Sequence, residues 1–99
     1  MSAQFTLTES AAQDIEEIAD YLAAQSSFDS SEKFVRRLNA QLAKIAQFPR
    51  IGRSRDEISK GIRSFPMDSY LILYIPSGAN VDVLRVVSKY RNLRRLFET

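Results

Sequence analysis

The sequence of 99 residues contains no cysteine and no histidine. Without cysteine there is no disulfide framework and no thiolate chemistry, and a reducing cytoplasm is compatible with the chain. Without histidine there is no imidazole to act as a general base or as a zinc ligand. Any acid–base catalysis would therefore have to use Tyr, Lys, Arg, Asp or Glu side chains, and we expect neither a metal ion nor another cofactor.

Long apolar runs are also missing. No stretch approaches the roughly 20 apolar residues that span a bilayer. The first ten residues, MSAQFTLTES, carry neither the basic nor the apolar region of a signal peptide. We therefore expect a cytoplasmic protein without a membrane partner. A hydrophobic content of 44% and a charged content of 26% are ordinary for a globular protein, and this length supports one small domain, residues 1–99.

Basic residues are absent from the first third of the chain. All 14 Lys and Arg residues lie from Lys33 onward, so residues 1–32 carry only acids. These acids are Glu9, Asp14, Glu16, Glu17, Asp20, Asp29 and Glu32. This asymmetry, inside a net charge of only +2, favours a face that attracts an anionic partner. The alternative is that an acidic helix and a basic helix neutralise each other within the fold.

Hydrophobic periodicity predicts a short strand followed by two helices. Phe5 and Leu7 fall on one face of a strand over residues 4–7. Apolar residues then recur at helical spacing up to about Gln25, and again up to about Gln47, where Pro49 stops the helix. A short polar connection between two amphipathic helices predicts an antiparallel helical hairpin.

Polar residues before each helix are candidates for the N-caps. Thr8 or Ser10 can cap the first helix, and Ser10 with Gln13 has the spacing of a capping box. Asp29 can cap the second helix, with Glu32 three residues further on.

After Gly61 the pattern changes from helices to strands. The segments 61–65, 69–75 and 81–87 are predicted to form an antiparallel meander. Residues 69–75 are apolar almost throughout, which is typical of a central strand buried on both faces.

A short helix over residues 90–97 is expected to turn Leu93, Leu96 and Phe97 inward. The predicted fold class is therefore α+β: an N-terminal strand, an antiparallel helical hairpin packed on a small, mainly antiparallel sheet, and a short C-terminal helix. The other face of the sheet is too apolar to lie bare in water, so the last helix or a partner must cover it.

Arg85 stands in an otherwise apolar strand. In a regular strand Val81, Val83 and Val87 share its face, and Leu84 and Val86 face the other way. An isolated buried charge is costly, so Arg85 needs an anionic partner. We expect an internal carboxylate such as Asp82, Glu57 or the C-terminus, or else an external phosphate or acid; the internal pair is the commoner outcome.

The other basic residues gather in the segment FPRIGRSRDEISKGIRSF (48–65) and after Arg85. The residues that we expect to bind an acidic partner are Arg50, Arg53, Arg55, Arg63, Arg85, Lys89 and Arg91. Arginine suits this role because its guanidinium pairs with a carboxylate in bidentate fashion. Nucleic-acid binding by the chain alone is not favoured, since the net charge is small and the pI of about 9.2 is near the threshold for that footprint.

A second hypothesis for the same region is RNA cleavage without a metal ion. The ribose 2′-OH would attack, arginines would stabilise the phosphorane charge, and Tyr90 or Lys89 would transfer the proton. The candidate catalytic residues are Arg63, Arg85, Tyr90 and Arg91. No specific motif supports this set, and we expect no catalytic activity of the chain's own.

The chain resembles the ParE toxins of the RelE/ParE superfamily of bacterial type II toxin–antitoxin systems. The resemblance rests on the stretches LTESAAQDIEEIADYL, FVRRLNAQLAKIAQFPRIGRSRDEI, GIRSFPMDSYLILY and VDVLRVVSKYRNL, which cover nearly the whole chain in the family's order. It implies the fold predicted above. It also implies a cognate ParD-like antitoxin encoded beside the toxin, which would fold on binding and form a hetero-oligomer with it.

The resemblance leaves the target open between two branches. ParE-like proteins are associated with poisoning DNA gyrase and with plasmid or chromosome maintenance, whereas RelE-like relatives cut mRNA on the ribosome. The central strand here has no basic residue, and Ser88 stands where many members of the superfamily have a histidine. Asn92 also replaces the aspartate that ParE relatives often have. The missing basic residue and the missing histidine favour the gyrase branch, whereas Asn92 is a departure from the ParE pattern; a third possibility is an antitoxin-binding module without toxicity.

Overall fold

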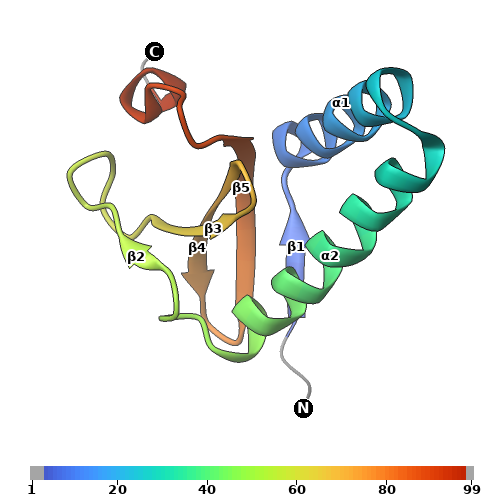
Figure 1. The fold of residues 1–99 in the computed structure, drawn as a ribbon. Helices are drawn as coiled ribbons and strands as arrows, with labels where there is room; N and C mark the ends of the chain where they lie inside the picture. Colours follow the sequence, from blue (N-terminus) through green and yellow to red (C-terminus); the bar gives the residue numbers. More distant parts are fainter. Residues whose placement is uncertain (1–3, 98–99) are drawn as a thin grey trace.

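The structure is a computed structural model that describes residues 4–97. Two helices lie on one side of a five-stranded sheet, and a short 3-10 helix, η1, follows the last strand (Figure 1). The elements are β1 (Gln4–Leu7), α1 (Glu9–Gln25), α2 (Phe28–Gln47), β2 (Arg53–Ser54), β3 (Arg63–Met67), β4 (Tyr70–Ser77), β5 (Asn80–Ser88) and η1 (Leu93–Phe97). The predicted α+β architecture is confirmed, including the limits of the first strand and the ends of both helices.

The sheet has the strand order β1-β5-β4-β3-β2. β1 runs parallel to β5, and the other neighbours are antiparallel, so the sheet is mainly antiparallel as predicted. β4 is its central strand, and four successive residues of β4, from Leu71 to Tyr74, are buried. The chain therefore brings its first strand beside its last one, with α1 and α2 packed over the same side of the sheet.

The residues that cap the two helices differ in part from the prediction. Thr8 caps α1, because its Oγ1 accepts a hydrogen bond from the Ala11 N–H at 3.1 Å. The Thr8 N–H donates to Val83 O, so the sheet holds this residue in the extended conformation that an N-cap needs. The predicted capping box at Ser10 is therefore wrong. Ser27, and not Asp29, caps α2.

The main core lies between the helices and the sheet. Its helical side is contributed by Ala11, Phe34, Leu38, Leu42 and Ile45, and its strand side by Met67, Ile72, Tyr74, Val81, Val83 and Val86. The helical stripe has the i, i+4 and i+3 spacing that places apolar side chains on one face. This core explains why the hairpin packs against the sheet and faces solvent with its charged side.

The opposite face of the sheet is also apolar. Leu71, Leu73 and Val87 are buried there, and they alternate along the strands with the residues of the main core. The loop between β2 and β3 and the helix η1 lie on this side (Figure 1). The three apolar residues of η1 that were predicted to face inward are half-buried, while Arg94 and Arg95 are exposed.

A bulge in β5 interrupts the regular alternation. Tyr74 pairs with Val83 and Leu73 pairs with Arg85, so Leu84 is an extra residue without a partner on β4. An extra residue reverses the in–out alternation beyond it. Val86 therefore joins Val81 and Val83 in the main core. The predicted arrangement, with Val86 on the opposite face from these valines, is wrong for this reason.

Candidate partner-binding site

The anionic partner of Arg85 is Asp14 on α1. Arg85 Nε donates to Asp14 Oδ2 at 2.7 Å, and Arg85 Nη2 donates to Asp14 Oδ1 at 2.9 Å. The two side chains are only 22% and 11% exposed. An internal ion pair was the commoner of the predicted outcomes and is confirmed, whereas the partners named for it, Asp82 and Glu57, are wrong. The C-terminus, the third suggestion, lies outside the described residues.

The two wrongly predicted partners have other bonds. Asp82 Oδ1 accepts hydrogen bonds from Thr6 Oγ1 at 2.7 Å and from Asn80 Nδ2 at 3.0 Å, which tie β1 to β5. Glu57 lies 3.8 Å from Arg55 in the loop between β2 and β3. Neither carboxylate is therefore free to meet Arg85.

Asp14 also completes the hydrogen bonding of β5 where β1 ends. β1 pairs with β5 only as far as Val83. Beyond this point, Leu84 O accepts from Thr8 Oγ1 at 2.9 Å, and the Val86 N–H donates to Asp14 Oδ2 at 3.0 Å. Two side chains from the start of α1 thus satisfy backbone groups that would otherwise lie at the bulge without a partner. We call the contacts of Asp14 with Arg85 and Val86 the Asp14 clamp.

The clamp fixes the charge state of Arg85. The hydrogen bonds from Asp14 raise the pKa of Arg85, and partial burial opposes this effect without overcoming it. An arginine guanidinium is charged at any physiological pH, and here Asp14 balances that charge within the fold. One signal for this pair was present in the sequence and was missed: Asp14 is an acid one helical turn from Ala11, on the face that packs on the sheet.

Arg63 and Tyr74 hold the loop that follows α2. Tyr74 Oη donates to Pro49 O at 2.7 Å and accepts from the Gly52 N–H at 2.8 Å. Arg63 Nη1 donates to Gly52 O at 2.7 Å. Burial of the phenol raises the pKa of Tyr74, so its hydroxyl stays protonated and can donate. We call residues 48–52, held by these bonds, the 48–52 loop.

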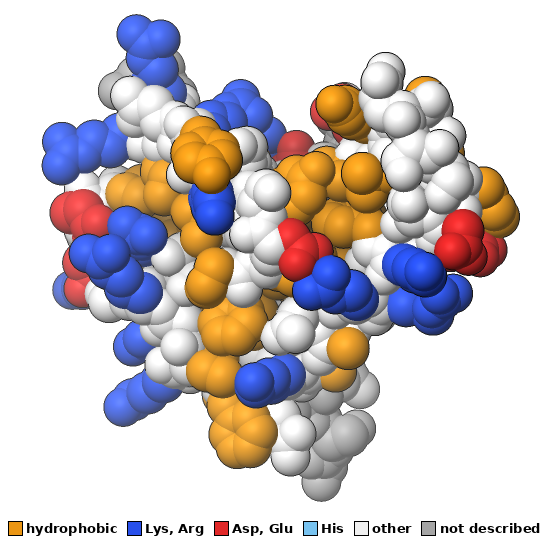
Figure 2. Space-filling view, in the orientation of Figure 1, with side chains coloured by type: hydrophobic (Ala, Val, Ile, Leu, Met, Phe, Trp, Pro, Cys, Tyr) orange, Lys and Arg blue, Asp and Glu red, His pale blue; other side chains and the backbone are white. Residues whose placement is uncertain are grey.

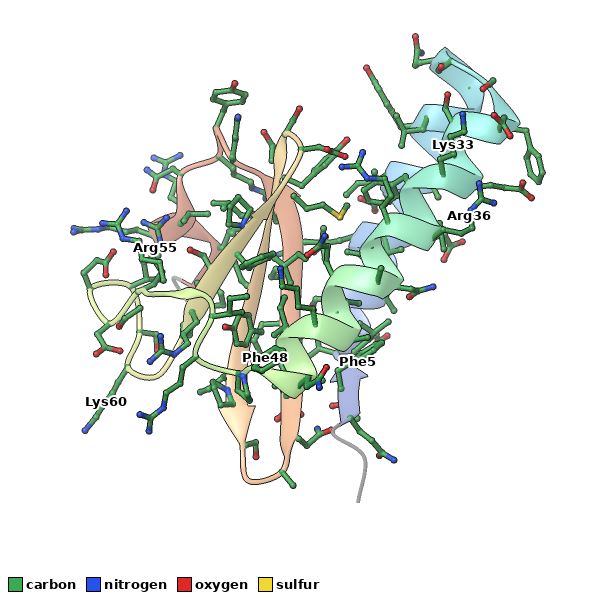
Figure 3. All side chains as sticks on the ribbon, turned by 60° about the horizontal axis from the view of Figure 1, so that its bottom comes forward. Phe5, Lys33, Arg36, Phe48, Arg55 and Lys60 are labelled. Carbon is green, nitrogen blue, oxygen red and sulfur yellow. The ribbon has the colours of Figure 1, made fainter. Side chains whose placement is uncertain are left out.

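The remaining predicted residues of the segment 48–65 differ in exposure. Arg55 is engaged inside the fold, because its Nε donates to Ser64 Oγ at 2.8 Å. Arg50 and Arg53 are exposed, and neither belongs to an ion pair within residues 4–97. Figure 3 shows Arg55 and Lys60 on the far side of the sheet from α2, and Phe48 where α2 ends. Of these arginines, Arg50 and Arg53 are the ones available to a partner.

The residues after β5 form an exposed turn. Tyr90 is 81% exposed, Lys89 Nζ lies 5.4 Å from the centre of its ring, and Arg91 is exposed beside them. Arg63 donates to the 48–52 loop and Arg85 is held in the Asp14 clamp, so two of the four candidate catalytic side chains already have acceptors within the fold.

The charge asymmetry of the sequence persists in the fold. Among the described residues, the Asp14–Arg85 pair is the one ion pair that joins an acid of α1 to a basic residue. The other acids of α1 (Glu9, Glu16, Glu17 and Asp20) are exposed. Figure 2 shows many Lys and Arg side chains on the side of the sheet away from the hairpin. They lie over β2, the loop that follows it and η1. The alternative was that an acidic and a basic helix neutralise each other, and no ion pair joins α1 to α2 within residues 4–97.

Neither a metal-binding cluster nor a membrane-spanning helix is found within residues 4–97. Within this range no group of three or more Asp or Glu side chains is placed to hold a metal ion. Neither of the two long helices described is apolar enough along its length to cross a membrane. What the surface offers instead is exposed arginine and lysine beside apolar side chains, which is a chemistry for binding an acidic, partly apolar partner.

Comparison with known proteins places the chain in a family. A family model described as the ParE toxin of the type II toxin–antitoxin system parDE matches residues 5–93. Toxin ParE1 of Mycobacterium tuberculosis is 32% identical over 96% of this chain and 98% of its own length. Toxin ParE3 of Caulobacter vibrioides is 30% identical over 60% of this chain and 59% of its own length.

A solved structure confirms the fold. It is described as the chromosomal ParDE TA system from P. aeruginosa, and it aligns with a TM-score of 0.75 over 88% of this chain and 96% of the other, at 19% identity. The fold and the family model agree with the resemblance read from the sequence. The chain belongs to the ParE toxin family of type II toxin–antitoxin systems.

Proposed function

We propose that the protein inhibits DNA gyrase by binding to it, without catalysis of its own, and that a ParD-like antitoxin neutralises it in a hetero-oligomer. Membership of the ParE family implies a cognate antitoxin as a partner. Gyrase as the target is the further step. The observation that supports it is that two of the arginines from which a ribonuclease site would have to be built already donate to acceptors within the fold.

A metal-independent ribonuclease needs its cations and its proton donor around one phosphate. Arg63 and Arg85 already donate to acceptors within the fold: Arg63 to Gly52 O, and Arg85 to both oxygens of Asp14. They also hold different elements, because Arg63 binds the loop that follows α2 and Arg85 binds α1. This arrangement supports binding rather than phosphodiester cleavage.

The contacts that we propose come from the exposed members of the predicted set. Arg50, Arg53, Lys89 and Arg91 have exposed side chains and can pair with carboxylates of a partner. Arg55 and Arg85 act indirectly in this proposal, since they are bonded within the fold to Ser64 and Asp14. Arg63 holds the 48–52 loop through carbonyl oxygens, which do not balance its positive charge. The predicted set of basic residues is thus divided between cations that stabilise the fold and cations that face outward.

The test is a supercoiling assay. Purified protein is incubated with DNA gyrase, ATP and relaxed plasmid, and the products are separated on an agarose gel. We expect loss of supercoiling, or protein-linked cleaved DNA, and recovery when the antitoxin encoded beside this chain is added first. A matched reaction with topoisomerase IV would show whether the effect is specific to gyrase.

Normal supercoiling at saturating protein would contradict the proposal. Programmed ribosomes with a labelled mRNA would then test the ribonuclease alternative, in which cleavage should be lost in a Tyr90→Phe variant while antitoxin binding remains. Tight antitoxin binding without activity in either assay would indicate a module that binds its antitoxin and is not toxic.

A further inference from the structure

An open pocket lies where α2 ends beside β3 and β4. Its volume is about 750 Å³, within the range of sites that hold a small molecule or a few side chains. Apolar side chains contributed by Phe48, Ile51, Ile75 and Pro76 line it, and Arg50 and Arg63 bring positive charge to it. No Asp or Glu is among its lining residues. We call this space the α2-end pocket.

The wall formed by the 48–52 loop is held in place by the strands. Tyr74 binds this loop at both Pro49 and Gly52, and Arg63 binds it at Gly52. The loop also passes so close to Tyr74 that a Cβ at Gly52 would lie 2.5 Å from the phenolic oxygen. A surface that is fixed before binding loses little conformational entropy when a partner arrives.

This fixed wall keeps apolar groups in water. Phe48 is 56% exposed and Ile51 is 39% exposed, although the same chain buries comparable side chains in its core. Figure 2 shows hydrophobic side chains continuing down to the lower end of the molecule, with Lys and Arg side chains next to them. A contiguous apolar patch with a polar rim is typical of a surface that another molecule covers.

The charges around the pocket define the occupant. Arg50 belongs to no ion pair within residues 4–97, and Arg63 is bonded to backbone carbonyls, which leave its positive charge unbalanced. The complementary partner therefore carries a bulky apolar side chain with a carboxylate close beside it. A peptide segment with Leu, Ile or Phe next to Asp or Glu has this chemistry.

We propose that the α2-end pocket receives such a segment of the antitoxin, with the apolar side chain between Phe48 and Ile51 and the carboxylate on Arg50 and Arg63. This inference rests on the proposed neutralisation by an antitoxin. A nucleic acid fits less well, because binding single strands relies on successive aromatic platforms and a basic groove. Here Phe48 is the one aromatic side chain lining the pocket, and the other walls are aliphatic.

The experiment compares two exposed phenylalanines at different places on the molecule. Phe48→Ala removes a wall of the pocket, and Phe28→Ala removes a side chain that is 72% exposed at the turn between α1 and α2, outside the pocket lining. Each protein is titrated with the purified, fluorescently labelled full-length antitoxin encoded beside this chain. We expect the Kd to rise about tenfold or more for Phe48→Ala, as at an interface hot spot, and to stay within about twofold for Phe28→Ala.

A second pair of variants tests the charge. Arg50→Gln should weaken antitoxin binding and reduce its salt dependence, since rim charges act through electrostatics. Arg36→Gln, an exposed position on α2 outside the pocket, should leave both unchanged. If Phe48→Ala does not fold, the Kd of Ile51→Ser is measured in its place. The chemical shifts of the Ile51 and Gly78 amides of the wild type, followed as antitoxin is added, give the same information.

Equal Kd values for the wild type, Phe48→Ala and Ile51→Ser would overturn the inference while leaving neutralisation intact. The inference also fails if these variants bind antitoxin normally but lose gyrase inhibition, because the pocket would then serve the target. Loss of binding to a short single-stranded RNA, with normal antitoxin binding, would reassign the pocket to nucleic acid. If the wild type does not bind the antitoxin at all, the proposed function itself fails.

Discussion

The Asp14 clamp and the 48–52 loop use arginine in opposite ways. In the clamp, Arg85 meets a carboxylate with two hydrogen bonds, and both charges are balanced inside the fold. In the loop, Arg63 meets backbone carbonyls, and the loop's other support is the neutral hydroxyl of Tyr74. Both arrangements fix a segment, but only the second leaves positive charge for a partner. The acceptor that an arginine binds therefore indicates whether its charge is available.

The largest effect is expected from removing the acid of the clamp. In Asp14→Ala, Arg85 keeps its charge without a partner and the Val86 N–H loses its acceptor. Breaking a buried pair in this way should lower the free energy of unfolding by about 3 kcal/mol. Urea denaturation followed by circular dichroism measures it. In a double-mutant cycle with Arg85→Leu, the effects of the two substitutions on the free energy of unfolding should be strongly non-additive. Additive effects would show that the two residues do not depend on each other.

The 48–52 loop should be most sensitive at Gly52. A Cβ in Gly52→Ala would lie 2.5 Å from Tyr74 Oη and 2.9 Å from Ser64 O, so either the loop or the tyrosine must move. We expect a loss of about 2 kcal/mol, within the range for overpacking. The control is Gly78→Ala, where a Cβ meets nothing within 4 Å but φ is +60°. Backbone strain alone should cost that variant about 1 kcal/mol.

A smaller effect, with a distinctive pH dependence, is expected for Tyr74→Phe. Losing the hydroxyl leaves Pro49 O and the Gly52 N–H without this partner, which should cost about 1 to 2 kcal/mol at neutral pH. Burial raises the pKa of Tyr74 above its ordinary value of 10.0, so folding favours the protonated phenol. That contribution is present below pH 10 and is lost as pH rises through the folded-state pKa.

The stability of the wild type and of Tyr74→Phe should therefore converge at alkaline pH. Urea midpoints measured at several pH values between neutral and alkaline would show this convergence. A constant difference over the whole range would mean that ionisation of Tyr74 is not linked to folding.

The smallest effect on stability is expected at the exposed arginines. Arg50→Glu and Arg53→Glu should leave the free energy of unfolding within about 0.5 kcal/mol of the wild type, as is usual for surface positions. Antitoxin binding should nevertheless weaken in both, measured by titration at moderate salt. Unchanged affinity would remove these side chains from the interface. Arg63→Glu is unsuitable for this comparison, because Arg63 also holds Gly52 and its loss would disturb the loop.

The parts of the fold that could be predicted are those determined by local pattern. The strand over residues 4–7 and the helix ends at Gln25 and Gln47 follow from apolar spacing and from Pro49, and they are confirmed. The cap of α2 was missed because Ser27 and Asp29 are both good caps. The structure selects Ser27, which is extended with φ −159°, whereas Asp29 lies in the first turn and pairs with Lys33.

The candidate site was less predictable because its contacts are distant in sequence or involve the backbone. Asp14 and Arg85 are separated by 71 residues, and the bulge at Leu84 that brings Val86 to Asp14 has no simple sequence signal. Arg63 was identified as a candidate residue, but its acceptors are carbonyl oxygens, which every residue carries. Sequence could therefore name the arginines that are candidates for binding, but not which of them the fold already uses.

The parallel pairing of β1 with β5 has a consequence for synthesis of the chain. Thr6 and Asp82, which are hydrogen-bonded across these strands, are 76 residues apart. The helical hairpin can form from local contacts as it leaves the ribosome. β1, however, has no strand to pair with until β5 has been made, and such long-range closure is slow. A chain released early, before residue 80, has no strand on which to place β1 and no Arg85 to meet Asp14. Incomplete copies of this protein should therefore be recognised as unfolded and degraded.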